Sequence, residues 1–218
     1  MDKILLFAKK TNWCNRAVEY VNTLYKDNAL VFQGDIGNPF PSKAGLWGGE
    51  IIISYLSPWI IPEEILHRAS KATINFHPGS PEYPGAGCYN FALYEEAKEY
   101  GVTCHHMLKK VDTGQIIAIK KFSIDEAETV QSLKEKSMRH IWELFVETMN
   151  YLISNKDLPM SSLCWSRGPF RRKQIDDLCQ ITPQMDKKEI ARRIRATYFP
   201  GAPGPYITLD GYKFEFSE

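Results

Sequence analysis

The sequence predicts an α/β fold in which a doubly wound, mostly parallel sheet carries a small C-terminal appendage of helix and β-hairpin. Continuous apolar runs, typical of strands buried on both faces, alternate with segments of helical periodicity in the first 78 residues. A long amphipathic helix follows, and the composition becomes loop-rich after about residue 155. Such an order of elements is that of the Rossmann-like folds, and 218 residues suffice for one such domain and an appendage.

Four strands and two helices are expected before the first long loop. The predicted strands are the apolar runs at residues 3–8 (KILLFA), 29–32 (ALVF), 50–54 (EIIIS) and 72–78 (ATINFHP). Apolar residues recur at helical spacing over residues 16–26, which predicts a helix there. Residues 62–70 open with a proline and two glutamates, which are favoured in the first turn of a helix, and predict a second one.

A loop, a helix and a β-hairpin are expected next. Prolines and glycines make up most of residues 78–87, which predicts an irregular loop. Residues 88–100 fit an amphipathic helix that Gly101 would end. The turn VDTG at residues 111–114 separates two strand-like segments and therefore predicts a hairpin.

The last part of the chain changes character. Residues 128–154 form one long helical pattern with a broad apolar stripe. Residues 190–196 predict a short basic helix, and the dipeptide Asp210-Gly211 predicts a closing hairpin turn. We therefore divide the chain into a catalytic-type domain, residues 1–155, and an appendage, residues 156–218.

Charge and cysteine content exclude several classes of protein. The 27 Lys and Arg against 26 Asp and Glu argue against a main partner that is nucleic acid or an anionic membrane. The five cysteines include no CxxC pair, so neither a disulfide framework nor a zinc ribbon is expected. No apolar segment is long enough for a signal peptide core or a membrane span, which favours a cytoplasmic location.

Three polar residues are candidates for chemistry at one rim of the predicted sheet. Asn75 and His77 lie two positions apart at the carboxyl end of a strand, so their side chains point to the same face. Asp112 lies in the hairpin turn, and ligands of open α/β sheets collect at the carboxyl ends of the strands. From spacing alone, a simpler interpretation stays open, because polar residues often serve as strand-end and turn groups.

This trio would suit acyl transfer to an amine. The Asn75 amide can donate to a developing oxyanion, and His77 can donate a second bond or shuttle a proton. Asp112 would orient the imidazole and favour its protonated form. Because the sequence lacks a GxSxG motif, direct attack by the amine is favoured over an acyl-enzyme.

Residues 75–117 resemble the core of the formyltetrahydrofolate-dependent formyltransferases. The shared features are Asn-x-His-Pro, a Pro/Gly loop, a helix, Gly-Val-Thr and Asp-x-Gly. The resemblance implies that Asn75, His77 and Asp112 are catalytic and that 10-formyltetrahydrofolate is the cosubstrate, with no metal. By the same resemblance, the residues expected to bind the cosubstrate are Tyr55, Leu56, Ser57, Pro58, Thr103, His105 and Val111. Gly79-Ser80-Pro81-Glu82 departs from the family's Ser-Leu-Leu-Pro, so we expect this loop to differ in shape from that of the family.

The acceptor is predicted from the remaining segments. Residues 167–176 and 194–214 resemble the extension that methionyl-tRNA formyltransferases share with nucleotide-sugar N-formyltransferases. The near-neutral charge and the short appendage favour a nucleotide-linked amino sugar. The resemblance to the nucleotide-sugar enzymes implies a product used in lipopolysaccharide or O-antigen biosynthesis. The residues expected to contact this acceptor are Trp13, Pro78, Tyr83 and Arg171, and Trp59 is a further aromatic candidate for the sugar's base or the pterin.

Several alternatives stay open. The acceptor could be methionyl-tRNA or glycinamide ribonucleotide, and the chain could be a non-catalytic folate-binding or assembly module. A metal site of His77, Cys88, Cys104 and His106 follows no common ligand spacing. The apolar closing hairpin must pack on the body or on a second chain, and we expect a homodimer.

Overall fold

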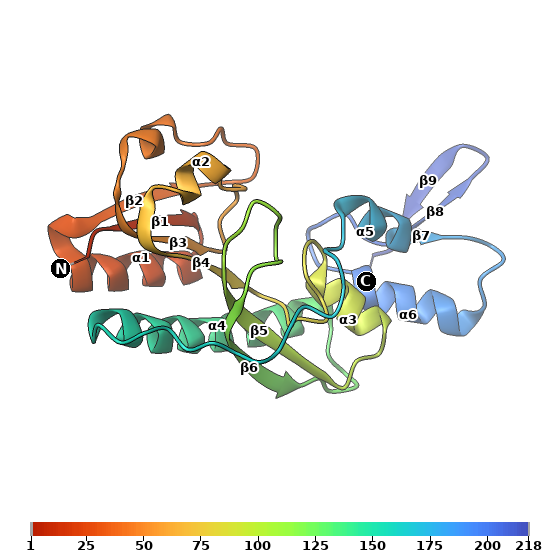
Figure 1. Cartoon of the computed structure of the whole chain (residues 1–218). Coiled ribbons are helices and arrows are strands. Elements are labelled where there is room, and N and C mark those ends of the chain that lie inside the picture. The colour runs from red at the N-terminus through yellow and green to blue at the C-terminus, as the bar shows by residue number, and fades with distance from the viewer. Residues whose placement is uncertain (1, 218) are drawn as a thin grey trace.

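The computed structural model describes residues 2–217 and contains a six-stranded mixed sheet with a smaller sheet beside it (Figure 1). The strand order in the large sheet is β2-β1-β3-β4-β5-β6. Its strands are β1 (Ile4–Lys9), β2 (Ala29–Gly34), β3 (Gly49–Tyr55), β4 (Ala69–His77), β5 (Glu99–His106) and β6 (Ile116–Ser123). The first four strands pair in parallel, whereas β5 and β6 are antiparallel, so the predicted α/β class with a mostly parallel sheet is confirmed.

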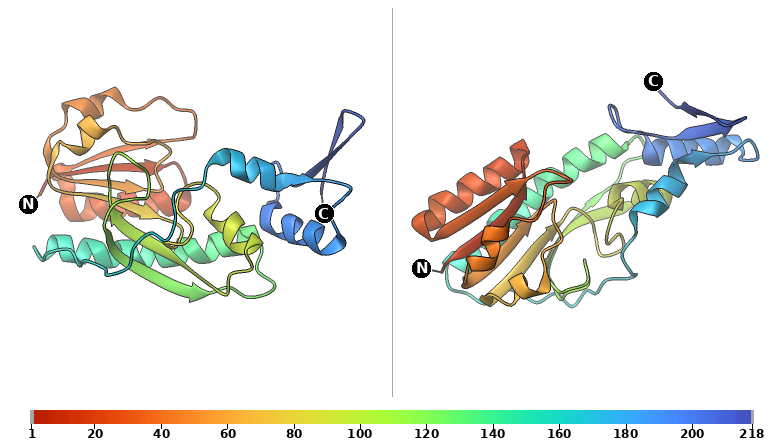
Figure 2. Two further views of the ribbon diagram at one scale, coloured as in Figure 1. Left: turned by 45° about the vertical axis from the view of Figure 1, so that its right-hand side comes forward. Right: turned by 90° about the horizontal axis from the view of Figure 1, so that it is seen from above.

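Helices cover both faces of the large sheet (Figure 2). They are α1 (Asn12–Tyr25), α2 (Glu63–Leu66), α3 (Cys88–Tyr94), α4 (Val130–Ile153), α5 (Arg172–Cys179) and α6 (Lys187–Thr197), with 3-10 turns at Lys26–Asn28 and Ser42–Leu46. The buried faces of α1 and α4 pack together against one face of the sheet, where side chains of β1, β3, β4 and β5 form the largest core cluster. Residues of α2 and of the segment 40–66 pack on the other face of β1 and β3.

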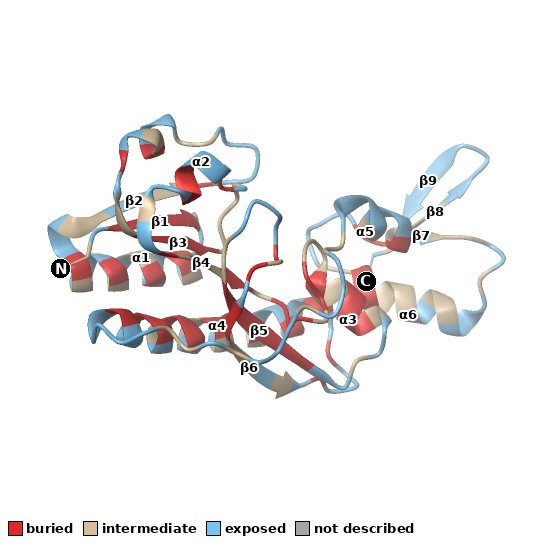
Figure 3. Cartoon of the chain, in the orientation of Figure 1, coloured by how far each residue is buried: buried red, intermediate tan, exposed pale blue. Residues whose placement is uncertain are grey.

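Local sequence explains where the two long helices begin. The Thr11 side chain accepts the backbone N–H of Cys14, and this N-cap starts α1 several residues before the predicted position. At the start of α4, Thr129 and Ser132 form a reciprocal capping box. The predicted apolar stripe of α4 is buried on the sheet (Figure 3).

Two predicted helices are too long. Of the helix expected over 62–70, only the four residues of α2 are helical, because β4 already begins at Ala69. The helix expected over 88–100 ends at Tyr94, and Glu96 adopts a left-handed conformation with φ 53°. Gly101 does not end a helix, since it lies inside β5 opposite Lys121 of β6. Pairing with distant strands thus overrides the local helical pattern.

The segment after residue 155 packs on the body through α6, while its closing hairpin projects outward. The predicted basic helix is α6, and the predicted hairpin is β8 (Tyr206–Leu209) with β9 (Tyr212–Glu215). Sequence patterns missed α5 and β7 (Gln180–Ile181), the strand that completes the three-stranded sheet. The Asn90 side chain on α3 donates to the Ala196 carbonyl on α6 at 2.7 Å. The boundary at residue 155 stays a prediction. Among residues 2–217, no helix combines the length and the apolar character that crossing a membrane requires.

Candidate active site

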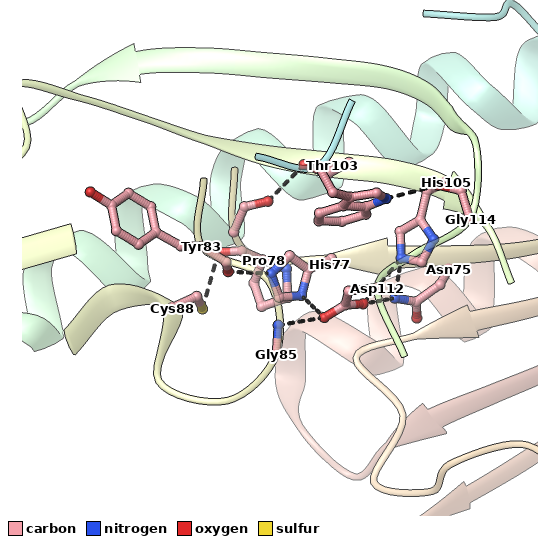
Figure 4. Close-up of polar contacts among 12 residues, drawn as sticks. Asn75, His77, Pro78, Tyr83, Gly85, Cys88, Thr103, His105, Asp112 and Gly114 are labelled. Atoms are coloured by element: carbon pink, nitrogen blue, oxygen red, sulfur yellow. Dashed lines mark hydrogen bonds and ion pairs between the residues drawn. The ribbon is translucent and has the colours of Figure 1, made fainter. Parts of the chain in front are cut away.

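Polar side chains from β4, β5 and the following turn meet beside the carboxyl end of β4 (Figure 4). The antiparallel register of β4 and β5 places Asn75 opposite His105 and His77 opposite Thr103. Asp112 lies in the turn between β5 and β6, in a left-handed conformation with φ 48°. The three residues that the sequence predicted as a catalytic trio are therefore neighbours in space.

Asp112 is the centre of this cluster. Its Oδ2 lies 3.2 Å from His77 Nδ1 and accepts the backbone N–H of Gly85 at 2.7 Å. Its Oδ1 lies 3.2 Å from His105 Nε2 and 3.5 Å from Asn75 Nδ2. The carboxylate is 3% exposed, so its charge is balanced by these partners and hardly by water.

His77 faces an oxygen acceptor with each ring nitrogen. Its Nε2 donates to the Tyr83 carbonyl at 2.9 Å, while Nδ1 faces Asp112. A doubly protonated ring would satisfy both acceptors. Gly79 makes this arrangement possible, because a Cβ there would collide with His77 Nε2.

His105 is a second imidazole on Asp112. Its Nδ1 donates to the His106 carbonyl at 2.8 Å, which directs Nε2 toward Asp112 and toward Asn75 Nδ2, 3.0 Å away. The adjacent His106 is on the alternate face of β5, and burial lowers its pKa. Of the two histidines, only His105 joins the Asp112 cluster.

The electrostatic balance keeps Asp112 ionised. Burial alone raises the pKa of this carboxyl, but the charge of His77, the bond from His105 and the Gly85 N–H together hold the pKa well below its usual range. A fixed negative charge is thus held between the two imidazole rings. Such a pairing of buried groups is common where proton transfer or oxyanion stabilisation takes place.

The cluster forms the end wall of a cavity of about 510 Å³, a size typical of cofactor and substrate sites. Asn75, His77 and Asp112 all line it. Of the other predicted site residues, those in the lining are Leu56, Ser57, Pro58, Pro78, His105 and Val111. Trp59, the further aromatic candidate, and Phe170, which the sequence analysis missed, also contribute to the wall.

The remaining predicted site residues lie outside this lining. Tyr55 and Thr103 are fully buried: Tyr55 packs on Phe145 of α4, and Thr103 donates to the Gly79 carbonyl. Tyr83 acts through its backbone carbonyl on His77, since its ring is buried. Ser54 of β3 lines the cavity, so the period-two alternation along this strand would have placed the neighbouring Tyr55 on the opposite face.

Two predicted acceptor contacts are also outside the lining. Trp13 lies on α1 and packs on the core, with the Arg16 guanidinium 5.1 Å from its ring centroid. Arg171 is exposed at the N-cap of α5, directly after Phe170. A role for either side chain in acceptor binding would require contacts beyond the cavity walls.

The metal alternative has no support in the described part of the chain, where no group of three or more acidic, histidine or cysteine side chains could hold an ion. Burial raises the pKa of the Cys88 thiol to about 11 and that of Cys104 to about 12. Both thiols therefore stay protonated at neutral pH and behave as small apolar side chains.

Residues 50–149 match the family model described as formyl transferase. The chain is 26% identical over 163 residues to the GDP-perosamine N-formyltransferase of Brucella melitensis biotype 1, which covers 74% of this chain and 62% of the relative. It is 33% identical over 172 residues to the methionyl-tRNA formyltransferase of Caldanaerobacter subterraneus subsp. tengcongensis, which covers 74% of this chain and 52% of the relative. The chain spans less than two thirds of the length of either relative.

The fold is similar to that of a solved N-formyltransferase from Helicobacter canadensis, in complex with folinic acid and dTDP-3-aminofucose. The TM-score is 0.75 at 22% identity, and the match covers 97% of this chain and 85% of the other. At this identity the similarity establishes a shared architecture that includes the C-terminal appendage.

Proposed function

We propose that this chain, which carries a formyl transferase domain over residues 50–149, transfers the formyl group of 10-formyltetrahydrofolate to the amine of a nucleotide-linked amino sugar. The match confirms the resemblance to the formyltransferases that residues 75–117 predicted. The observation that carries the proposal is Asp112, a buried carboxylate held between His77 and His105 at the end wall of the cavity.

The donor would occupy the cavity with its formyl group at Asn75. The amide nitrogen of Asn75 lies 3.0 Å from His105 Nε2 and donates at 3.5 Å to Asp112 Oδ1, the same oxygen that faces His105. A formyl oxygen can replace the longer contact, so this N–H would donate to the oxyanion that forms when the amine attacks. His77 would add positive charge beside that oxygen, and Asp112 would hold the imidazole in place and help to relay the amine proton. The bond between the formyl carbon and the folate nitrogen then breaks, and the proton lost by the amine passes to that leaving nitrogen.

An amino-sugar acceptor is supported by relatives and by charge. The Brucella relative is a GDP-perosamine N-formyltransferase, and the Helicobacter protein was solved with dTDP-3-aminofucose. The cavity is lined by Lys9 and Lys110, which suit the anionic groups of a folate tail or a nucleotide. A cytoplasmic location and a role of the product in O-antigen synthesis stay predictions.

A second acceptor deserves a direct test, because the relative with 33% identity is a methionyl-tRNA formyltransferase. The formal net charge of +1 offers little attraction for tRNA, whose binding depends on phosphate contacts. We therefore favour the sugar.

The test is a screen of dTDP-, UDP- and GDP-linked amino sugars with 10-formyltetrahydrofolate, followed by chromatography and mass spectrometry. The expected result is one acceptor that gains a single formyl group, and no gain with the His77→Asn variant. Methionyl-tRNA in place of the sugar is the second arm. Product only in that arm would replace the sugar proposal, and saturable folate binding without any product would identify a non-catalytic module.

We further propose that the enzyme is a homodimer joined through the β8–β9 hairpin. The hairpin extends away from the body (Figure 1), and all four residues of β9 are exposed. Tyr212 is 72% exposed and Phe214 is 55% exposed. A second copy of the same hairpin would cover these rings and pair the open edge of β9.

A further inference from the structure

A short segment of the appendage, Trp165–Phe170, crosses the candidate active site and is called the strap below. It lies more than fifty residues after Asp112 in the chain, yet it is hydrogen-bonded to the Pro/Gly loop of residues 78–87. Phe170 donates its N–H to the Pro84 carbonyl at 2.9 Å and accepts the Ala86 N–H at 3.0 Å. Phe170 of the strap thus forms a parallel β-bridge with Gly85.

This loop supplies two contacts of the catalytic cluster. The Gly85 N–H bonds to Asp112, and the Tyr83 carbonyl accepts from His77. The Ser166 N–H bonds to the Pro81 carbonyl at 3.2 Å, so the strap holds the loop on either side of both contacts. The position of the loop therefore depends on a segment outside the domain that the family model matches.

Trp165 connects the strap to the other side of the cluster. Its indole N–H donates to the Gly114 carbonyl at 2.8 Å, in the same turn as Asp112. The indole centroid lies 5.0 Å from the His105 ring, at an interplanar angle of 89°, and 5.9 Å from the His77 ring, at 66°. One side chain thus contacts both imidazoles that flank the carboxylate.

We infer that Trp165 is a positioning residue for formyl transfer, a conclusion that rests on the proposed function. The bond to Gly114 fixes the orientation of the indole, and the indole in turn limits the rotation of His77 and His105. The ring also excludes water from the His77–Asp112–His105 cluster, where a low dielectric strengthens the charge interactions. Trp165 touches neither substrate in this role, and it acts through the histidines.

The positioning role makes a prediction that a merely structural role does not. Trp165→Ala should lower kcat about 100-fold, while KM for the formyl donor changes little, because misplaced catalytic groups affect the chemical step. Trp165→Phe keeps an aromatic ring but loses the bond to Gly114, so the expected loss is about 10-fold. Trp142→Ala is the matched control, because Trp142 is also half-buried but packs on Tyr20 and Phe145, away from the cavity.

A second readout is independent of turnover. The ring N–H protons of His77 and His105 are bonded and shielded, so we expect slowly exchanging imidazole proton resonances in the parent, which His77→Asn and His105→Asn would assign. These resonances should disappear in Trp165→Ala and remain in Trp142→Ala. If Trp165→Ala does not fold, Trp165→Leu, which fills most of the space without an aromatic ring, takes its place.

The outcomes separate this inference from the proposed function. A parent that formylates no acceptor contradicts the proposed function, and the proton resonances still decide the role of Trp165. Unchanged kcat, unchanged resonances, or a rise in KM with kcat retained in the folded variant would each overturn the inference.

Discussion

The Asp112 cluster and the β8–β9 hairpin differ in how their side chains are exposed to water. In the cluster, charged groups are withdrawn from water, and each carboxylate oxygen of Asp112 has a partner within the chain. In the hairpin, the aromatic rings of Tyr212 and Phe214 face outward and are largely uncovered by the rest of the chain. The first region is complete within one chain, whereas the second presents an edge and a face that a neighbour can use.

The two regions therefore differ in how much they contribute to the stability of the folded chain. Buried charges require exact pairing, and the loss of one partner leaves the others desolvated. An exposed apolar hairpin contributes little to the stability of its own chain, so it can be altered at small cost. Substitutions in the two regions should therefore differ in both size and kind of effect.

The largest effect is expected at the centre of the cluster. Asp112→Asn removes the negative charge that His77 and His105 share, and we expect kcat to fall about 10³-fold. Steady-state formylation of the acceptor found in the screen measures this loss. Asp27→Asn is the control, since Asp27 is exposed, and a similar loss in both variants would contradict the assignment.

The turn that carries Asp112 should also tolerate an added side chain poorly. A Cβ at Gly114 would collide with the His106 carbonyl oxygen, so Gly114→Ala should lower the free energy of unfolding by about 3 kcal/mol. Gly48→Ala meets no atom within 4 Å and should change it by less than about 0.5 kcal/mol. Urea unfolding of both variants measures the contrast, and equal stabilities would show that the turn can relax.

Acid should destabilise the folded chain through the Asp112 cluster. The pKa of Asp112 is lower in the folded chain than in the unfolded chain, so the unfolded state binds more protons at acidic pH. Its contribution to stability is present above the ordinary carboxyl pKa of about 4 and is lost as the pH falls toward the folded value. Urea unfolding between about pH 7 and pH 3 should show a shallower pH dependence in Asp112→Asn than in the parent. Parallel curves would contradict the paired carboxylate.

The smallest effect on the single chain is expected in the hairpin. The double variant Tyr212→Ser, Phe214→Ser should leave the thermal midpoint of the monomer nearly unchanged, because both rings are exposed. Sedimentation velocity should show a shift from dimer to monomer. A parent that is already monomeric at micromolar concentration would disprove the proposed homodimer.

Much of the fold followed from local sequence patterns. The continuous apolar runs predicted β1, β2, β3 and β4 within a few residues, because strands buried on both faces require them. The Asp210-Gly211 turn predicted the closing hairpin for an equally local reason. The predicted helices over 62–70 and 88–100 were too long, because β4 and β5 recruit their last residues.

The candidate site was predictable only in part. The two-residue spacing of Asn75 and His77 placed both on one face of a strand, and the structure confirms that they line one cavity. The resemblance indicated Asp112, yet nothing local showed which atoms it would contact. The sequence patterns did not indicate Trp165, because it lies in the loop-rich segment after residue 155, which has no periodic pattern.

The sequence by itself determined which segments become strands and helices and which polar residues stand at the strand ends, since period and apolar content are local properties. Only the tertiary structure decided that Asp112 lies between two histidines and that the strap from the appendage closes over them. Such contacts join residues far apart in the chain, and they form only where the packing of β4, β5 and their loops brings the groups within bonding distance.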